Sequence, residues 1–440
     1  MFRRNILSSY TSRWTIADAL KVHADDPTTT MPVIAQDFPT MDESVMIWDT
    51  GALRNIHGQT VTFKGWHIIW SLAVDKIDLT NADIYDEWHS RNNRAYIGYW
   101  YSRTGNGADW QWGGRPLNTS ADLRPHEWSG GLVMREGTGN VVDMFYTSEA
   151  DSPVNQSVPS VSSGQIFADE NGVWFGGFET TTEMFSADGI HNANSQQDEY
   201  FDFRDPHPFI NPADGRLYCL YESNVAGMRG DFVIGSDEQG ALPPGFEVGS
   251  GAQYGAASIG IAVLADGAYK KGDFSGQNWT QLDPLVSALG VNDQMERPHI
   301  VFKDGLTYLF TISHHSTYSG NLGGPDGVYG FVSEKGLFGP YKPLNASGLV
   351  LGNPSAAPYQ TYSHFVDPAG YVQAFIDTLP GVGEYPNNPA TFRIGATLAP
   401  TVKIELDGDR TFLTEVHGYG QVYAQAAWPV GAAWDKRPAN

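Results

Sequence analysis

Three acidic side chains stand in sequence contexts that suit chemistry at an acetal or ketal carbon. Such a reaction needs two carboxyl groups, one that attacks the carbon and one that first donates and then accepts a proton. Each acid lies beside an aromatic residue or an arginine at the edge of a predicted strand, where side chains from successive strands can converge on one mouth. The three segments are Ile47-Trp48-Asp49-Thr50-Gly51, Phe203-Arg204-Asp205-Pro206-His207-Pro208 and Asn292-Asp293-Gln294-Met295-Glu296-Arg297-Pro298-His299.

The neighbours of these acids suggest different roles for them. A proton donor must keep its proton near neutral pH, and burial or nearby negative charge raises the pKa of a carboxyl group. Arg204 acts in the opposite direction and is expected to keep Asp205 ionised. Asp205 therefore suits a permanently charged acceptor of sugar hydroxyl groups better than it suits a proton donor.

Each motif also has a purely structural interpretation. An aspartate after a tryptophan is commonly a turn or cap residue, and the Arg-Asp-Pro and Glu-Arg-Pro triplets are commonly ion-paired. The acidic segment Asp198–Asp205 is an alternative metal site, but the sequence has neither EF-hand spacing nor a His-Glu-x-x-His motif. His314 and His315, adjacent on a predicted strand, point to opposite faces, which disfavours zinc. Only the joint occurrence of the three motifs indicates an active site.

Short strands joined by turns must position these residues. The chain has 440 residues, of which 41% are hydrophobic, 13% aromatic and only 18% charged, with 49 glycines and 26 prolines. This composition suits many short strands and excludes a helical bundle. We predict one closed all-β domain over residues 1–440, either a propeller or a large barrel. Predicted strands include 66–73, 95–102, 141–147, 173–178, 217–222, 258–265, 299–302, 307–313, 327–333, 371–377 and 402–406.

Few segments predict helices or long loops. An amphipathic stretch from Trp14 to Val22 predicts a short helix within an N-terminal lead-in over residues 1–25. Asp283-Pro284, followed by an apolar run and Gly290, predicts one or two helical turns over residues 285–289. Residues 222–255 are rich in glycine, proline and acidic residues and predict a long surface loop.

The charge balance and the cysteine count exclude several classes of function. The formal net charge of −23 disfavours nucleic acid and anionic membrane surfaces as partners. Cys219 is the single cysteine, so neither an intrachain disulfide nor a multi-cysteine zinc site can form. No apolar run is long enough to cross a bilayer. The first residues carry Arg3 and Arg4 but no apolar h-region, so we expect no ordinary cleaved signal peptide.

The three acid motifs, in this order and at this spacing, resemble the levansucrase and fructosyltransferase family, which acts on sucrose. The similarity extends from about residue 12 to residue 430 and is greatest to the branch from Gram-negative bacteria. The supporting segments are Asp26–Pro32, His126–Gly131, Leu309–His314, Gly330–Ser333, Gly339–Tyr341 and Leu398–Val402.

The resemblance implies a five-bladed β-propeller with a central funnel that holds sucrose. It implies that Asp49 is the nucleophile, that Glu296 is the acid/base and that Asp205 stabilises the transition state. Two tryptophans would form the walls of the fructosyl pocket, a serine would orient the nucleophile, and polar residues would contact the glucosyl unit or the acceptor. The implied substrate-binding residues are Trp48, Trp128, Ser129, Arg204, Gln294, Arg297 and His314.

The resemblance also bears on cofactors and location. Gln294 and His314 occupy positions that carry glutamate and arginine in the Gram-positive members, and both substitutions fit the Gram-negative branch. Asp293 matches one ligand of the structural calcium of Gram-positive members, but the other ligands find no match, so we expect no metal or other cofactor. Members of this branch are often exported without a cleaved signal, which predicts an extracellular protein.

Several activities remain open within and beyond this family. The favoured one transfers fructosyl units from sucrose to a growing β-2,6 fructan acceptor and also to water. The same fold can act as an inulosucrase that builds β-2,1 linkages, or mainly as a sucrose-hydrolysing β-fructofuranosidase. More distant alternatives are a non-catalytic carbohydrate-binding propeller and a propeller hydrolase acting on arabinan or xylan. The oligomeric state is not predicted.

Overall fold

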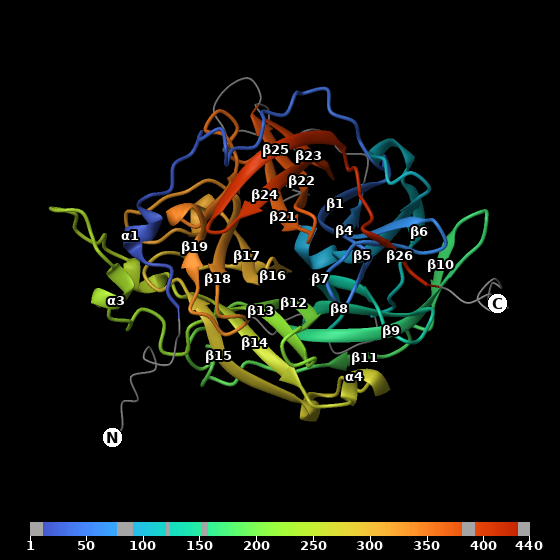
Figure 1. Ribbon diagram of the computed structural model, residues 1–440, viewed down its shortest axis with the longest axis horizontal. Coiled ribbons are helices and arrows are strands. Elements are labelled where there is room, and N and C mark those ends of the chain that lie inside the picture. Colours follow the sequence, from blue (N-terminus) through green and yellow to red (C-terminus); the bar gives the residue numbers. More distant parts are fainter. Residues whose placement is uncertain (1–11, 77–90, 120–123, 151–156, 381–391, 430–440) are drawn as a thin grey trace.

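Five antiparallel sheets radiate from a common axis in the computed structural model of the chain, which describes residues 12–76, 91–119, 124–150, 157–380 and 392–429 (Figure 1). The innermost strands of the five sheets contact one another in a closed ring. The fold is therefore a five-bladed β-propeller, and the fold predicted from the family resemblance is confirmed. In ring order, the inner strands are β1 (Val45–Ala52), β7 (His126–Met134), β12 (Phe203–Ile210), β16 (Glu296–Lys303) and β21 (Thr361–Val366).

Consecutive stretches of the chain build most of each blade, in the sheet orders β1-β4-β5-β6, β7-β8-β9-β10, β12-β13-β14-β15, β16-β17-β18-β19 and β21-β22-β24-β25. Four short or side strands, β2, β11, β20 and β23, join these sheets, and β3 pairs with β26. The remaining bounds are β2 (Arg54–Asn55), β3 (Val61–Thr62), β4 (His67–Asp75), β5 (Tyr96–Ser102), β6 (Gln111–Gly114), β8 (Val141–Glu149), β9 (Val158–Ala168), β10 (Val173–Gly176), β11 (Thr181–Glu183), β13 (Leu217–Asn224), β14 (Ala257–Leu264), β15 (Trp279–Ser287), β17 (Leu306–Ser313), β18 (Gly327–Ser333), β19 (Lys342–Pro343), β20 (Leu349–Gly352), β22 (Tyr371–Pro380), β23 (Phe392–Leu398), β24 (Pro400–Asp407), β25 (Arg410–Tyr419) and β26 (Ala426–Ala427).

Local chemistry explains why these segments form strands and turns. Both faces of a middle strand are covered by neighbouring blades, so β13 and β14 are buried along their whole length. β14 is a run of apolar and small residues, whereas β13 is apolar and aromatic until it ends in the polar residues 222–224. The β16–β17 turn has Asp304 at φ 53° and Gly305 at φ 78°. Two successive positive φ values suit the tight hairpin turn that the Asp-Gly pair predicts.

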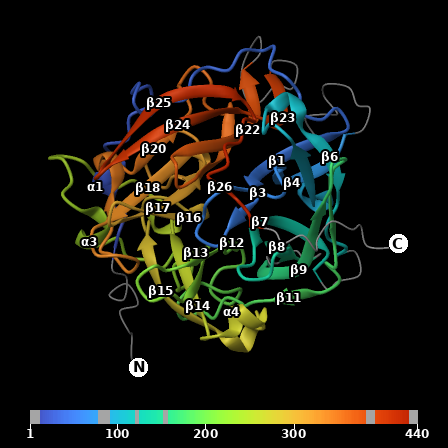
Figure 2. The ribbon, with the colours of Figure 1, turned by 45° about the vertical axis from the view of Figure 1, so that its right-hand side comes forward.

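The two ends of the described chain hold the ring of blades together. Val422 donates to the carbonyl of Gly105 at 2.7 Å, and β26 pairs in parallel with β3, so the C-terminal segment packs on the first blade. At the other end, Trp14 donates to Ser287 of β15 at 2.9 Å, and residues further on cross the fourth blade (Figure 2). These contacts connect blades that lie far apart in sequence.

One predicted helix is wrong. Residues 279–287 form β15, in which Val286 pairs with Ile259 and is fully buried. Extending the sheet of the third blade buries Leu285 and Val286, and this outweighs the local helix-start signal of Asp283-Pro284. The predicted helix near residues 14–22 is a single turn, α1, whose N-cap Thr15 accepts from the backbone N–H of Asp18.

The other helical segments are short turns on the periphery or near the axis. The long loop predicted over residues 222–255 begins later than expected, because residues 222–224 complete β13, and residues 225–256 contain only two of these turns. Among the described helices, none is long and apolar enough to cross a bilayer. Predictions for the first 11 residues lie outside the described residues. The helical turns are α1 (Ile16–Ala19), α3 (Ser236–Gln239), α4 (Ala268–Lys271), η2 (Arg91–Arg94), η3 (Gly107–Asp109), η4 (Ala252–Tyr254), η5 (Gly276–Asn278), η6 (His315–Thr317) and η7 (Leu344–Ala346).

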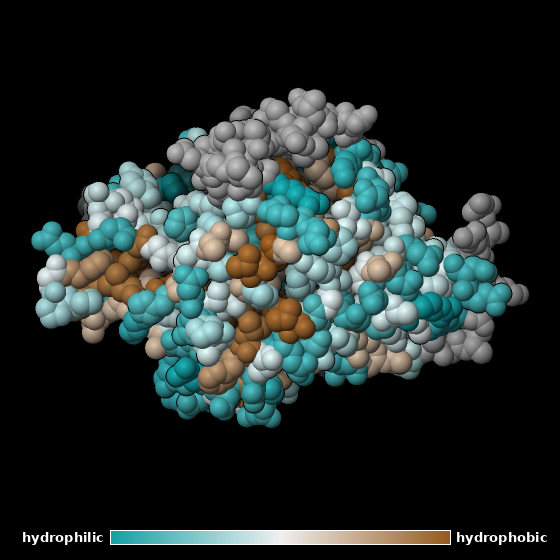
Figure 3. Space-filling view, turned by 90° about the horizontal axis from the view of Figure 1, so that it is seen from above, coloured by the Kyte–Doolittle hydropathy of each residue, from teal (hydrophilic) through white to brown (hydrophobic). Residues whose placement is uncertain are grey.

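Hydrophilic side chains cover much of the face shown in Figure 3, and the apolar residues on it form separate patches. This distribution agrees with the excess of acidic residues. Cys219 is buried in β13, where burial raises the pKa of its thiol and keeps it in the unreactive form.

Candidate active site

Each of the five inner strands has an irregularity in its pairing with the second strand of its blade. The register shifts lie between Trp48 and Gly51, Trp128 and Gly130, Arg204 and His207, Glu296 and His299, and Tyr362 and Phe365. A β-bulge adds a residue to one strand and re-aims its side chain. Repetition of this feature in every blade turns at least one side chain of each inner strand toward the axis.

Four of these irregular positions hold non-glycine residues in the left-handed region. Their φ values are 53° at Asp49, 63° at Asp205, 45° at Arg297 and 58° at Ser363. Such a conformation costs about 1–3 kcal/mol and persists only where the surrounding structure imposes it. Four of the ten non-glycine residues with positive φ in the described chain therefore lie at the level of the ring where the acid motifs lie.

A cavity of about 260 Å³ occupies this level of the axis and contains side chains from all five blades. Of the residues predicted for the site, all except Ser129 line it, and Ser129 contacts the lining through a hydrogen bond. The structure thus brings the three acid motifs together. The lining residues are Trp48, Asp49, Arg91, Trp128, Arg204, Asp205, Gln294, Glu296, Arg297, Ile312, His314, Tyr362, Phe375 and Asp377.

Asp49 is held from both sides. Ser129 of the neighbouring blade donates to Oδ2 of Asp49, which leaves Oδ1 as the oxygen available to a ligand. The backbone around Asp49 is anchored because Ser71 donates to the carbonyl of Trp48 at 2.7 Å and Arg297 donates to the carbonyl of Thr50 at 3.2 Å. Buried side chains therefore fix the position of this carboxylate.

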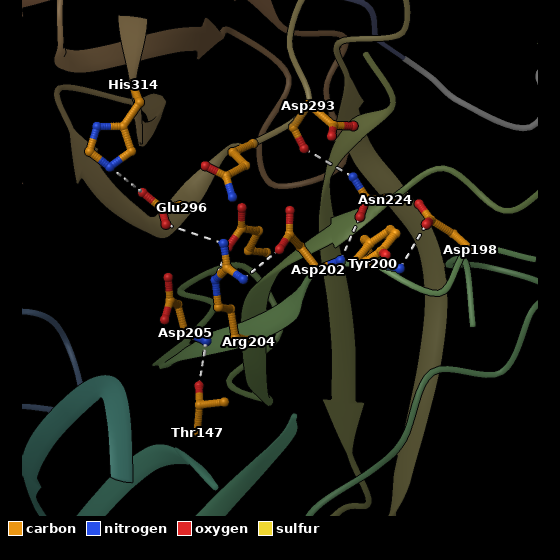
Figure 4. A network of polar contacts seen from close by, with 12 residues as sticks. Thr147, Asp198, Tyr200, Asp202, Arg204, Asp205, Asn224, Asp293, Glu296 and His314 are labelled. Atoms are coloured by element: carbon orange, nitrogen blue, oxygen red, sulfur yellow. Dashed lines mark hydrogen bonds and ion pairs between the residues drawn. The ribbon is translucent and has the colours of Figure 1, made fainter. Parts of the chain in front are cut away.

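Asp205 is buried and does not pair with Arg204 in the way the sequence suggests. Its Oδ2 accepts from the backbone N–H of Arg297 at 2.9 Å, and its own N–H donates to Thr147 at 2.8 Å (Figure 4). Burial raises the pKa of Asp205, and the charges of Glu296 and Asp49 add to this, while Arg204 opposes them only in part. Arg204 thus favours ionisation of Asp205, as the sequence predicts, but burial and the two neighbouring acids oppose it.

The strand register explains where Arg204 points instead. Arg204 lies opposite Glu222 in the β12–β13 pair, and its Nε contacts the Glu222 carboxylate at 2.7 Å. The other guanidinium nitrogens contact Asp202 and Glu296, the latter at 3.2 Å. Arg204 therefore contacts three carboxylates at once, and of these Glu296 lines the cavity (Figure 4).

Glu296 receives hydrogen bonds on both carboxylate oxygens. Arg204 donates to Oε1, Tyr362 donates to Oε2, and Nε2 of His314 lies 3.9 Å from Oε2. The next residue, Arg297, extends away to the carbonyl of Ser363 at 3.1 Å and so ties the fifth blade to the first. Each of these contacts restricts the direction in which Glu296 faces the cavity.

His314 lies just beyond the end of β17, not on a strand with His315 as predicted. Its ring stacks on Tyr362 with centroids 3.6 Å apart, and its Nδ1 lies 3.2 Å from Oδ2 of the buried Asp326. Burial alone would lower the pKa of His314, but Asp326, with Glu296 and Asp377, raises it to about 9. His314 is therefore a cation at neutral pH.

This raised pKa predicts a pH dependence of stability. Because the folded-state pKa of His314 lies above its ordinary value of 6.5, its contribution to stability is complete below about pH 6.5 and is lost as pH rises through about 9. We expect the gap in thermal unfolding midpoint between the parent protein and His314→Gln to be larger at pH 6 than at pH 10. Differential scanning calorimetry measures both midpoints. A gap independent of pH would contradict the assignment.

Several cavity residues have no part in the sequence prediction. Tyr362-Ser363 repeats, at the same place in its blade, the aromatic-serine pair Trp128-Ser129, and this weak repeat is the signal that could have revealed it. Arg91 and Asp377 carry no such signal. The Arg91 guanidinium lies 4.9 Å from the Trp48 ring centre, and Asp377 is on β22, the second strand of its blade.

The acidic side chains near the cavity form ion pairs with arginines. Among the described residues, no group of three or more histidine, cysteine, aspartate or glutamate side chains is arranged to hold a metal ion. Asp202 pairs with Arg204, and Asp198 and Asp293 both pair with Arg229.

Carboxylates and arginines bind hydroxyl groups and aromatic rings pack on C–H surfaces, so the axial cavity of this five-bladed propeller suits a carbohydrate. Comparison with known proteins identifies the group within the class of carbohydrate-active proteins. Residues 4–423 match the family described as Levansucrase/Invertase, and the chain belongs to that family.

Individual relatives cover almost the whole chain. A levansucrase of Zymomonas mobilis subsp. mobilis is 52% identical over 417 residues, which are 95% of this chain and 93% of the relative. An extracellular sucrase of the same organism is 46% identical over 430 residues, 97% of this chain and 98% of the relative. The crystal structure of levansucrase from Gluconacetobacter diazotrophicus superposes with a TM-score of 0.82 at 33% identity, covering 96% of this chain and 95% of that one.

Proposed function

We propose that the protein is a levansucrase, a retaining fructosyltransferase that moves the fructosyl unit of sucrose to a growing β-2,6 fructan or to water. The observation that carries the proposal is that Asp49, Asp205 and Glu296, from three different blades, line one axial cavity. The membership of the family and the 52% identity to a levansucrase give the same substrate class.

In the first step, Asp49 attacks the anomeric carbon of the fructosyl unit. The bond from that carbon to the glucosyl oxygen breaks, and Glu296 donates its proton to the departing oxygen, so that glucose leaves. Ser129 occupies Oδ2 of Asp49, so Oδ1 is the attacking atom. The product is a fructosyl ester of Asp49, and Glu296 is now ionised.

In the second step, an acceptor hydroxyl or water enters the space that glucose vacated. Glu296 takes its proton, the acceptor oxygen bonds to the anomeric carbon, and Asp49 leaves as a carboxylate. Asp205 accepts hydrogen bonds from fructosyl hydroxyl groups in both transition states, where ring charge develops. Its fixed position, set by the backbone N–H of Arg297, prepares it for this contact.

The remaining lining residues bind the two sugar rings. Trp48 and Trp128 offer flat faces to the C–H surface of the fructosyl unit. Arg204 and His314 contact Glu296, and Gln294 lines the same cavity. These three residues bind the glucosyl unit or the acceptor with charge-assisted or neutral hydrogen bonds. No metal is assigned a role in either step.

Incubation with sucrose and analysis of all products tests the function. A levansucrase releases more glucose than fructose and forms polymer with β-2,6 linkages, which linkage analysis by NMR identifies. Equal amounts of glucose and fructose would instead indicate the hydrolase, the alternative favoured by the relative named an extracellular sucrase. β-2,1 linkages would indicate an inulosucrase. Products from arabinan or xylan, or no turnover of any of these substrates, would overturn the proposal.

His314 is proposed to act on the acceptor side of this reaction. We expect His314→Ala to keep hydrolysis within about tenfold of the parent rate but to lower the ratio of fructosyl transfer to hydrolysis, because a cation that binds acceptor hydroxyls is lost. Separate assays of glucose and fructose give the ratio. A loss of glucose release as complete as that of an Asp49 variant would show that the subsite assignment is wrong.

We further propose that residues 1–440 act as a single catalytic unit and that the protein works outside the cell. The description of a relative as an extracellular sucrase supports the location. Detection of sucrose-cleaving activity in culture medium, with intact cells as control, tests it.

A further inference from the structure

Arg229 connects the long excursion between β13 and β14 to the segment that leads into Glu296. Its Nη1 lies 2.9 Å from Oδ2 of Asp198 and 3.2 Å from Oδ1 of Asp293, and its Nη2 lies 2.6 Å from Oδ2 of Asp293. The carboxylate of Asp293 is thus bound by both arms of the guanidinium fork. This two-point geometry fixes direction as well as distance.

Asp293 is also held through its backbone. The carbonyl of Asp293 accepts from the side-chain amide of Asn224 at 3.0 Å, and its N–H donates to Thr317 at 3.0 Å. Oδ1 accepts, in addition, from the N–H of Ala256 at 3.2 Å. Asp293 therefore connects β13, whose Asn224 contact is drawn in Figure 4, with the excursion and the turn after β17.

The segment fixed in this way carries two residues of the cavity. Gln294 follows Asp293 directly, Glu296 lies two residues further on, and both line the cavity on the side assigned to the glucosyl unit or acceptor. The Gln294 N–H donates to Asn292 at 3.0 Å, and its carbonyl accepts from Ser313 at 2.8 Å. A displacement of Asp293 would therefore pass first to Gln294.

Charge makes Arg229 necessary at this place. The carboxylates of five residues lie close together here, and three cations of the described chain contact them: Arg204, Arg229 and, at 3.9 Å from Glu296, His314. The repulsion among these acids is felt by Asp202, whose pKa is raised by burial together with the charges of Asp293 and Glu296, although Arg204 lowers it. The five acids are Asp198, Asp202, Glu222, Asp293 and Glu296.

We propose that Arg229 is a positioning residue for the transfer reaction, an internal cation that holds the 292–296 segment so that Gln294 and Glu296 face the acceptor. This inference rests on the proposed function. Arg229 acts through Asp293 and does not touch the sugar. Its removal leaves two carboxylates without their cation, so that they repel the neighbouring acids and pull the segment out of place.

The test compares Arg229→Ala and Arg229→Lys with the parent protein and with Arg216→Ala. Arg216 is a matched control because it forms one exposed ion pair, with Asp266, away from the cavity. We expect Arg229→Ala to raise KM for sucrose by about tenfold or more and to lower the ratio of transfer to hydrolysis. Arg229→Lys should recover part of both, and Arg216→Ala should match the parent.

Chemical rescue separates positioning from general stability. Millimolar guanidinium chloride should partly restore KM and the transfer ratio of Arg229→Ala, while the same concentration of sodium chloride should not. Arg229→Ala combined with Asp293→Asn should also lose less than Arg229→Ala alone, because fewer unpaired charges remain.

Two results would overturn the inference. One is an Arg229→Ala protein with a lower unfolding midpoint but with the KM and transfer ratio of Arg216→Ala. If Arg229→Ala is insoluble, Arg229→Gln takes its place, and the inference fails if that variant keeps the parent KM and ratio. Glucose release by the parent protein is measured in the same assay, so failure of the proposed function is seen separately.

Discussion

Replacing Asp49 by asparagine is expected to lower the rate of glucose release from sucrose by about four orders of magnitude or more. The amide oxygen is a poor nucleophile, so the fructosyl ester cannot form. The fold should survive, because asparagine tolerates the left-handed conformation at this position, where φ is 53°, and Ser129 can still donate to the side-chain oxygen. Initial rates of glucose release measure the loss, and the thermal unfolding midpoint checks the fold.

A matched control and a rescue experiment make this prediction specific. Asp266→Asn removes an exposed carboxylate that pairs with Arg216, and it should leave the rate unchanged. Asp49→Ala leaves space at the anomeric carbon, so added azide should restore glucose release and form a fructosyl azide of inverted configuration. Glucose release by Asp49→Asn within tenfold of the parent rate would exclude Asp49 as the nucleophile.

The second large effect is expected at Glu296. Glu296→Gln should lower glucose release from sucrose by about 10²–10⁴-fold, because no proton reaches the departing glucosyl oxygen. The glutamine can keep its contact with Tyr362, so the side chain should remain in place. The loss should depend on the leaving group, since fluoride needs little protonation. Steady-state rates with sucrose and with fructosyl fluoride measure this difference.

The same variant should reveal the covalent intermediate. With fructosyl fluoride, Glu296→Gln is expected to give a rapid burst of fluoride and then slow turnover, because water has lost its general base. Mass spectrometry should then detect protein enlarged by one fructosyl unit, and peptide mapping should place it on Asp49. Glu415→Gln, which changes a half-exposed carboxylate away from the cavity, serves as the control. Equal losses with both substrates would contradict the role of Glu296 as acid.

Much of the strand content follows from local pattern. The predicted strands 307–313 and 327–333 correspond to β17 (Leu306–Ser313) and β18 (Gly327–Ser333). These segments alternate or run apolar between glycine-rich turns, and nothing in their neighbourhood opposes the local preference. The segment 285–289 fails for the opposite reason. Its helix-start signal is real, but its side chains gain more by completing the third blade.

The location of the acids could also be inferred from sequence, whereas their partners could not. Asp49, Asp205 and Glu296 stand out because each follows or precedes residues that suit a sugar site. Arg204 was expected to pair with its chain neighbour, yet the β12–β13 register aims it at Glu222. Arg229 and Asp293 are 64 residues apart, and no local pattern links them.

The amino-acid sequence by itself determined the class of chemistry, because residue type sets what a side chain can do. It also determined the strand-rich character of the chain, because strand formation follows from short-range pattern. Only the tertiary structure decided which cations face each carboxylate and which carboxylates are buried deeply enough for their pKa to be raised. Those properties depend on burial and on distances across blades, and both arise when the ring closes and the bulged inner strands turn their side chains toward one axis.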